Sequence, residues 1–156
     1  MKTIRPHSLA LLVLCLATFQ EVPPAAAERP LDHYAQWQKA APEYLDIEII
    51  DLNIRVEQKN DRLKVHHVQA LAIVHRVYRT TTELAEGEEI SIHYEHMEDL
   101  VTRAGPAAIP LLKKGEKYPA FLEINPTRDS YDPAASNQSF RPYLCDRSPS
   151  LCSTEN

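Results

Sequence analysis

Apolar and polar residues alternate along much of the chain between residues 45 and 124. At positions 90–95 the order Ile-Ser-Ile-His-Tyr-Glu places every apolar residue on one side, which is typical of a strand with one buried face. Residues 118–124 show the same period, and one face of that segment carries Tyr118, Ala120, Leu122 and Ile124. The pattern therefore predicts strands over both segments.

Two longer segments, residues 45–56 and 63–80, are rich in isoleucine, leucine and valine. The apolar phase of the first slips between Ile49 and Ile50, as it does where a β-bulge inserts one extra residue. A strand as long as 63–80 must bend, which suits a small barrel in which one strand serves two sheets. Together with a turn-rich end after Pro126, these segments predict an all-β fold, a small five-stranded barrel or sandwich with a short N-terminal helix.

The helix is predicted over residues 32–40, with Asp32 as its N-cap and Pro42 beyond its end. Tyr34 and Trp37 lie about one turn apart, so they share a face and are expected to pack on the domain. In the turn-rich end of the chain, the expected aromatic anchors are Tyr131, Phe140 and Tyr143.

The first 27 residues have the three parts of a secretory signal peptide. Lys2 and Arg5 precede an apolar run at residues 9–19, and small residues ending at Ala27 form an A-x-A cleavage site. An uncleaved anchor would need about 20 apolar residues, and the run ends earlier, at Gln20. We therefore expect cleavage after Ala27 and a mature protein that is periplasmic or secreted.

Charge and cysteine content narrow the function classes. Cleavage leaves 129 residues with 15 basic and 21 acidic side chains, a net charge of −6. A binder of nucleic acid or anionic lipid needs a basic face, so neither is an expected partner, and no stable membrane insertion is expected after cleavage. The two remaining cysteines, Cys145 and Cys152, are expected to form a disulfide, since their spacing is not the C-x-x-C of a redox pair.

These observations divide the chain into four parts. They are a signal peptide over residues 1–27, an N-terminal segment with the short helix over 28–44, the β-barrel domain over 45–143, and a flexible tail with a small disulfide loop over 144–156. The mature chain has the usual size of one domain.

The order of three motifs carries a resemblance. A strand at 70–77 (ALAIVHRV) is followed by a second strand at 90–94 (ISIHY) and by a turn and strand at 111–122 (LLKKGEKYPAFL). Over roughly residues 65–125, this order resembles the OB-type barrel of netrin modules and tissue inhibitors of metalloproteinases. The resemblance implies an OB-type barrel with an extracytoplasmic binding role. The chain has no cysteine near Glu28 and lacks the inhibitors' framework disulfides, so no inhibitory residue is carried over.

Six histidines remain after cleavage, and they include candidate metal ligands on two predicted strands. His75 and His93 would approach each other if these strands pair antiparallel. His96 and Met97, at the end of the second strand, would add ligands suited to copper or zinc. The alternative is that exposed strand positions simply tolerate histidine.

The chain shows no catalytic signature, because it has no G-x-S-x-G, no glycine-rich phosphate loop and no catalytic cysteine context. The leading hypothesis is a non-enzymatic binding module without a cofactor, whose partner is a protein in the cell envelope or outside the cell. The expected contact residues are Met97, Leu100 and Ile109, in and beside a proline-containing loop at 100–110, because loops on a rigid scaffold often carry binding. The alternative is a periplasmic copper or zinc carrier or sensor that uses the four candidate ligands.

Overall fold

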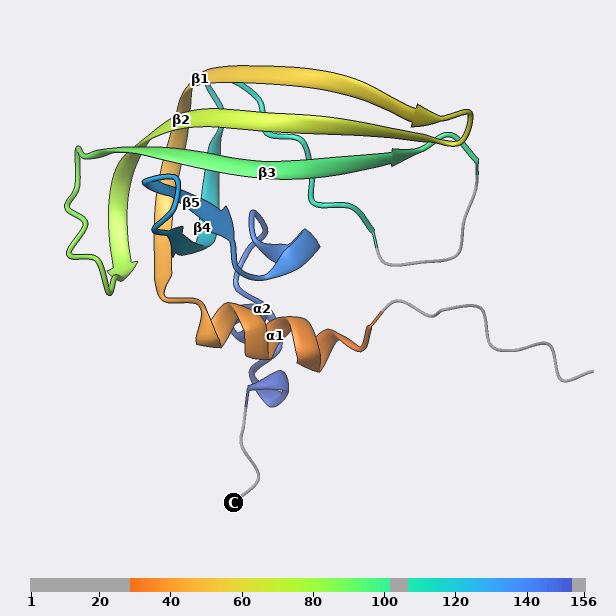
Figure 1. Ribbon diagram of the computed structural model, residues 1–156. Coiled ribbons are helices and arrows are strands. Elements are labelled where there is room, and N and C mark those ends of the chain that lie inside the picture. Colours follow the sequence, from red (N-terminus) through yellow and green to blue (C-terminus); the bar gives the residue numbers. More distant parts are fainter. Residues whose placement is uncertain (1–28, 102–106, 153–156) are drawn as a thin grey trace, which may run out of the picture.

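The computed structural model describes residues 29–101 and 107–152. One helix precedes five strands, which are α1 (Leu31–Ala40), β1 (Glu43–Asn60), β2 (Leu63–Arg79), β3 (Glu89–Asp99), β4 (Lys117–Asn125) and β5 (Ser130–Pro133). Three short helical turns follow, η1 (Ser136–Gln138), α2 (Leu144–Arg147) and η2 (Pro149–Leu151). The strands close into a barrel in the order β1-β2-β3-β5-β4 (Figure 1). The predicted all-β fold with five strands and a short N-terminal helix is confirmed.

Only part of each of the first three strands belongs to the closed barrel. β1 pairs with β4 only over Glu43–Glu48, whereas it pairs with β2 along almost its whole length. β3 meets β5 at a single parallel pair, Ile92 with Tyr131. The second half of β1, the first half of β2 and most of β3 therefore extend past the barrel as three antiparallel strands (Figure 1). We call residues 51–60, 63–71 and 91–99 the arm.

The predicted bulge in β1 is confirmed. Ile49 pairs with Ala72 and Asp51 pairs with Leu71, so Ile50 is the extra residue between them. A bulge bends its strand and increases the local twist. In this chain it lies where β1 leaves the barrel and enters the arm (Figure 1).

The barrel core is built from alternate residues of the strands, as the sequence pattern predicts. Leu45, Ile47 and Ile49 of β1 are fully buried, and Ile92 of β3 lies against them in the same cluster. Burying each large aliphatic side chain contributes about 1.5–3 kcal/mol. Gly87 and Gly115, with φ of +89° and +82°, form the turns that lead into β3 and β4.

β4 is buried on both faces, which differs from the single apolar face predicted for it. Ala120 and Leu122 face the barrel core, but Phe121 on the opposite face is also fully buried. Its ring stacks on Tyr44 with the centroids 4.4 Å apart. Ile124, expected to face the core, is 44% exposed. The outer face of β4 is buried because residues beyond the barrel strands cover it.

The helix packs as expected but begins differently. Tyr34 is buried and meets the Trp37 ring edge-on, with the ring centroids 5.5 Å apart, so the packing prediction is confirmed. The prediction that Asp32 caps the helix was wrong. The N-cap is Pro30, with no side-chain cap, and Asp32 Oδ1 instead accepts a hydrogen bond from the next residue, at 2.9 Å from His33 N.

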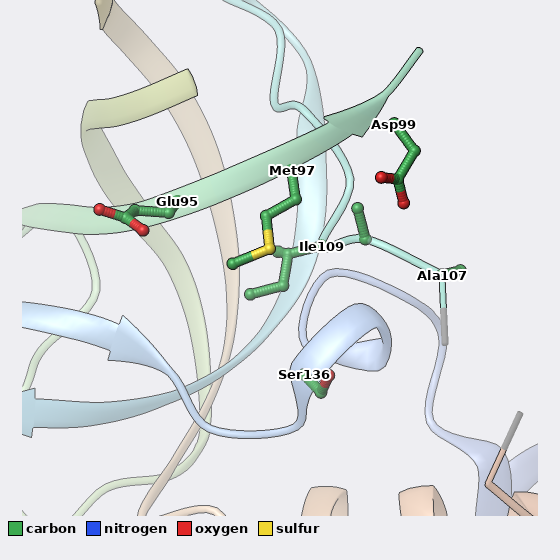
Figure 2. Close-up of a pocket in the computed structure, with 7 residues that line it drawn as sticks. Glu95, Met97, Asp99, Ala107, Ile109 and Ser136 are labelled. Atoms are coloured by element: carbon green, nitrogen blue, oxygen red, sulfur yellow. The ribbon is translucent and has the colours of Figure 1, made fainter. Parts of the chain in front are cut away.

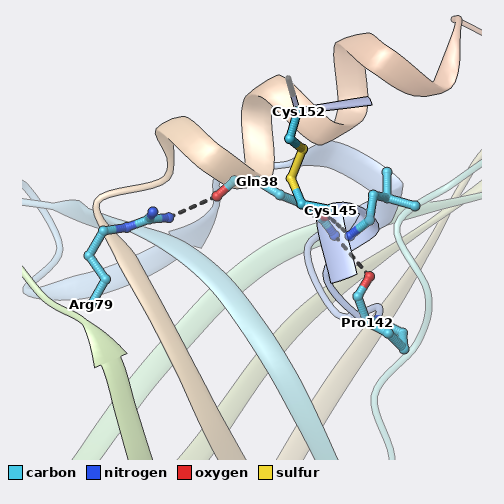
Figure 3. Close-up of a disulfide and its surroundings, with 6 residues drawn as sticks. Gln38, Arg79, Pro142, Cys145 and Cys152 are labelled. Atoms are coloured by element: carbon cyan, nitrogen blue, oxygen red, sulfur yellow. Dashed lines mark hydrogen bonds between the residues drawn. A yellow bond between two sulfur atoms is a disulfide. The ribbon is translucent and has the colours of Figure 1, made fainter. Parts of the chain in front are cut away.

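Hydrogen bonds of Gln38 connect the C-terminal segment to α1 (Figure 3). The Gln38 side chain donates from Nε2 to the Gln138 carbonyl at 2.9 Å and accepts at Oε1 from Leu144 N at 2.8 Å. Its backbone carbonyl accepts from the Arg79 guanidinium at 2.8 Å. Leu144 is buried against Tyr34. Leu144 and the two cysteines therefore contact α1, whereas residues 146–150 are exposed. The flexibility expected of residues 144–156 stays a prediction.

The predicted disulfide between Cys145 and Cys152 is present, with the Cα atoms 5.6 Å apart (Figure 3). A disulfide indicates an oxidising location outside the cytoplasm. In the described ranges, the helices are all too short or too polar to cross a membrane. The predicted signal peptide lies outside the described residues.

Candidate functional site

A cleft beside β3 brings together two of the three predicted contact residues (Figure 2). Its volume is about 260 Å³, and it is lined by Glu95, Met97, Asp99, Ala107, Ala108, Ile109 and Ser136. Met97 and Ile109 both line this cleft, and Met97 is 54% exposed. Leu100 follows the end of β3 and is 41% exposed, outside the cleft lining. Methionine is flexible and polarizable, so it suits an adaptable contact.

The cleft wall formed by residues 107–112 is held against the arm by hydrogen bonds. The Tyr94 hydroxyl donates to the Pro110 carbonyl at 2.8 Å and accepts from Leu112 N at 3.1 Å. His96 donates from Nδ1 to the Ile109 carbonyl at 2.6 Å. Burial raises the pKa of Tyr94 to about 12, so this hydroxyl keeps its proton at physiological pH. The wall is thus a fixed part of the scaffold.

The floor of the cleft includes Ser136 of η1, whose φ of +51° lies in the left-handed region. A serine in this region is uncommon and costs about 1–3 kcal/mol, a strain often found at binding sites. The Ser139 hydroxyl accepts a hydrogen bond from Ala135 N at 2.8 Å and supports this turn.

The structure does not bring the four predicted metal ligands together. β2 and β3 pair antiparallel as expected, but His93 lies opposite Gln69 and His96 lies opposite His66. His75 is six residues further along β2, which is about 20 Å at the rise of a strand. Among residues 29–101 and 107–152, no group of three or more histidine, cysteine, aspartate or glutamate side chains could hold a metal ion. His75 and His93 satisfy the same-face spacing, but the strand register separates them, and His96, three residues after His93, lies on the opposite face of β3.

Three of the strand histidines, His66, His67 and His75, instead lie within hydrogen-bond distance of glutamates on neighbouring strands, which the sequence pattern does not indicate. His66 Nε2 lies 2.8 Å from Glu98 Oε2, and His75 Nε2 lies 2.8 Å from Glu48 Oε2. The hydrogen bond from His75 lowers the pKa of Glu48, and the one from His66 lowers the pKa of Glu98. These pairs became visible only with the strand register.

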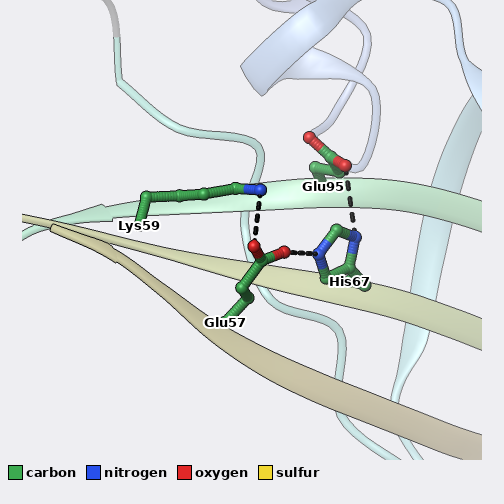
Figure 4. Close-up of polar contacts among 4 residues, drawn as sticks. All are labelled: Glu57, Lys59, His67 and Glu95. Atoms are coloured by element: carbon green, nitrogen blue, oxygen red, sulfur yellow. Dashed lines mark hydrogen bonds and ion pairs between the residues drawn. The ribbon is translucent and has the colours of Figure 1, made fainter.

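His67 lies between two carboxylates on the outer face of the arm (Figure 4). Its Nε2 is 3.1 Å from Glu57 Oε2 and its Nδ1 is 3.2 Å from Glu95 Oε1. Lys59 Nζ approaches Glu57 Oε1 at 2.7 Å. Hydrogen bonds from Lys59 and then from His67 lower the pKa of Glu57. The ring can donate to both glutamates only when both nitrogens carry protons. Lys59, Glu57, His67 and Glu95 are thus joined in one polar network across the three strands of the arm.

Comparisons of the chain with protein-family models, with curated proteins and with solved structures find no match. The resemblance to netrin modules stays a prediction, and the function has to be argued from the geometry of the surface.

Proposed function

We propose that this protein is an extracytoplasmic, non-enzymatic binding module that holds an extended segment of a protein partner in the cleft beside β3. The observation that carries the proposal is the half-exposed Met97 in a cleft whose opposite wall is fixed by hydrogen bonds. The closed order β1-β2-β3-β5-β4 supports an OB-type, netrin-like barrel as the scaffold. We place the mature protein in the periplasm or outside the cell, where the disulfide is stable.

The shape of the partner segment follows from the edge of β3. Beyond Ile92, β3 has a strand partner only on its β2 side within the described ranges, because β5 meets it at one pair. An open strand edge can accept an extended peptide through main-chain hydrogen bonds, while side-chain pockets beside it supply specificity. The cleft lies beside that part of β3.

The chemistry of the partner segment follows from the cleft lining. Met97, Ile109 and two alanines form an apolar wall, and Glu95 and Asp99 add carboxylates. Charges across an interface are arranged to be complementary. We therefore expect a segment in which an apolar side chain enters the cleft and a lysine or arginine lies close by. No cofactor takes part in this binding.

Site-specific cross-linking tests the proposal. A photoreactive amino acid is placed at Met97 in the full-length protein produced in its own cell, and at Val56 as a matched control. Val56 is 53% exposed and also belongs to the arm, but it does not line the cleft. We expect one defined protein to be cross-linked from position 97 and not from position 56.

Affinity measurements with that purified protein complete the test. Met97→Asp should weaken its binding at least about tenfold, and Leu100→Asp should weaken it less, because Leu100 does not line the cleft. Val56→Asp should leave the affinity unchanged. Equal cross-linking from both positions, or an affinity unaffected by Met97→Asp and Leu100→Asp, would refute the proposal.

A further inference from the structure

A second, larger cavity lies on the outer face of the arm. Its volume is about 450 Å³, and it is lined by Arg55, His67, Val68, Gln69, His93, Tyr94, Glu95 and Arg128. It shares only Glu95 with the cleft beside β3. A volume of this size is in the range of small-molecule sites.

The strand register explains why these polar side chains gather there. Arg55, His67 and Glu95 form one row across β1, β2 and β3. Gln69 and His93 lie opposite each other in the adjacent row on the same face, two residues along each strand. Arg128 comes from the turn between β4 and β5. Four segments distant in the sequence thus supply one polar surface.

The charges of this cavity are not balanced by its own carboxylates. Glu95, the carboxylate among the lining residues, is held by His67. Glu57, which does not line the cavity, is held by His67 and Lys59 (Figure 4). Arg55 and Arg128 line the cavity and form no ion pair within the described part of the chain. Although the protein has a net charge of −5, the two unpaired guanidinium groups at this cavity can pair with an anionic group of a ligand.

We propose that this cavity binds a short acidic saccharide. The ligand's carboxylate is held by Arg55 and Arg128, because a guanidinium matches a carboxylate with two parallel hydrogen bonds. The ring hydroxyls are held by Gln69 and His93, which both donate and accept hydrogen bonds, and by the Glu95 carboxylate, which accepts them. This site shares Glu95 with the protein-binding cleft proposed above, but the other residues that line the two sites differ.

Other anionic ligands fit the cavity less well. A phosphate-rich chain carries several negative charges close to Glu57 and Glu95, which would repel it. An acidic peptide buries apolar side chains as well as charges, and most of the side chains that line this cavity are polar. A saccharide with one carboxylate per ring keeps its charges one ring apart and brings several hydroxyls between them, which suits a lining of two guanidinium groups and several other polar side chains.

Calorimetric titration of the full mature protein with trigalacturonic acid tests the proposal. Its methyl ester, inorganic phosphate and a hexaglutamate peptide serve as the comparison probes. We expect trigalacturonate to bind and the uncharged methyl ester to bind at least about tenfold more weakly, since a charge-assisted hydrogen-bond pair is lost. We also expect phosphate and hexaglutamate to bind more weakly than trigalacturonate.

Variants locate the site. Arg55→Gln and Arg128→Gln should each weaken trigalacturonate binding about tenfold, and both side chains are exposed, so the fold should be retained. Arg62→Gln, in the turn between β1 and β2 and outside the cavity, is the matched control and should change nothing. The proposal is overturned by absence of trigalacturonate binding, by equal binding of the ester, by tighter binding of phosphate or hexaglutamate, or by unchanged binding in both cavity variants.

Discussion

A buried carboxylate, Glu43, holds the segment between β2 and β3 in place. The side chain is fully buried at the first position of β1. Its Oε1 accepts hydrogen bonds from Thr81 N at 3.0 Å, from Thr81 Oγ1 at 2.8 Å and from Thr82 N at 3.2 Å. Glu43 therefore supplies the acceptor for two backbone amides that follow the end of β2.

The cost of removing this acceptor can be worked out from those contacts. Hydrogen bonds to a charged group contribute about 1.5–3 kcal/mol each. Thr81 is exposed and can turn to water after the change, whereas Thr82 is half-buried. We therefore expect Glu43→Ala to lower the free energy of unfolding by about 3–4 kcal/mol. Glu43→Gln keeps an oxygen acceptor of similar shape, so its cost should be about 1–2 kcal/mol.

The pH dependence of the free energy of unfolding tests the role of Glu43 independently. Burial raises the pKa of Glu43, but hydrogen bonds from Thr80, Thr81 and Thr82 outweigh it and hold the pKa below its ordinary value of 4.5. A carboxylate with a lowered pKa stabilises the fold above its ordinary pKa, and this stabilisation is lost as the pH falls through the lowered value. Since glutamine cannot ionise, the stability difference between wild type and Glu43→Gln should shrink from pH 7 to pH 3.

Urea unfolding followed by the fluorescence of Trp37, the chain's single tryptophan, measures these differences. The helix that carries Trp37 ends shortly before Glu43, so the signal reports on this junction. Glu123→Gln on β4, an exposed glutamate, is the control and should cost less than about 0.5 kcal/mol. A cost below about 1 kcal/mol for Glu43→Ala, or a wild-type to Glu43→Gln difference that does not change with pH, would refute the reasoning.

Two further predictions concern the buried outer face of β4 and the C-terminal disulfide. Phe121→Ala should lower the free energy of unfolding by about 3–5 kcal/mol in urea unfolding, because this fully buried ring stacks on Tyr44; a cost under about 1 kcal/mol would contradict its burial. Cys145→Ser, which opens the loop to Cys152, should cost about 2.5 kcal/mol on the chain-entropy model. Intact mass of the wild-type protein without reductant should show no free thiol on these two cysteines.

The strands β1 to β4 were predictable from local apolar content and alternation, whereas β5 lies in the segment that was expected to be turn-rich. Ile90, Ile92 and Tyr94 alternate with polar residues and are all buried in the structure. The bulge at Ile50 was also predictable, since one extra residue changes the apolar phase in the sequence itself. Such features depend on residues a few positions apart.

The outer face of β4 was not predictable in the same way. Phe121 stands at a position that the alternation assigns to solvent, and it is buried because Ala41 and Ala135 cover it from outside the barrel. The packing of Leu144 has the same origin, because Gln38 and Tyr34 of α1 lie more than 100 residues earlier in the chain.

The candidate sites also differ in whether local sequence patterns or contacts between distant residues define them. Met97 and Ile109 could be chosen from the sequence because a loop follows the end of a half-buried strand. No sequence pattern marks Arg55 and Arg128 as residues of one cavity. His75 and His93 were wrongly expected to lie close together, because two residues on the same face of a sheet can still be far apart along the strands.

The sequence alone determined four of the five strand segments, the bulge, the helix and the cysteine pair, because alternation, phase and spacing are properties of neighbouring residues. Only the tertiary structure decided which rows of side chains stand opposite one another. Register pairs residues that lie 3 to 36 positions apart in the sequence, and a shift of one residue would turn every side chain to the other face. The ion pairs of the arm, both cavities and the covered face of β4 all depend on that choice.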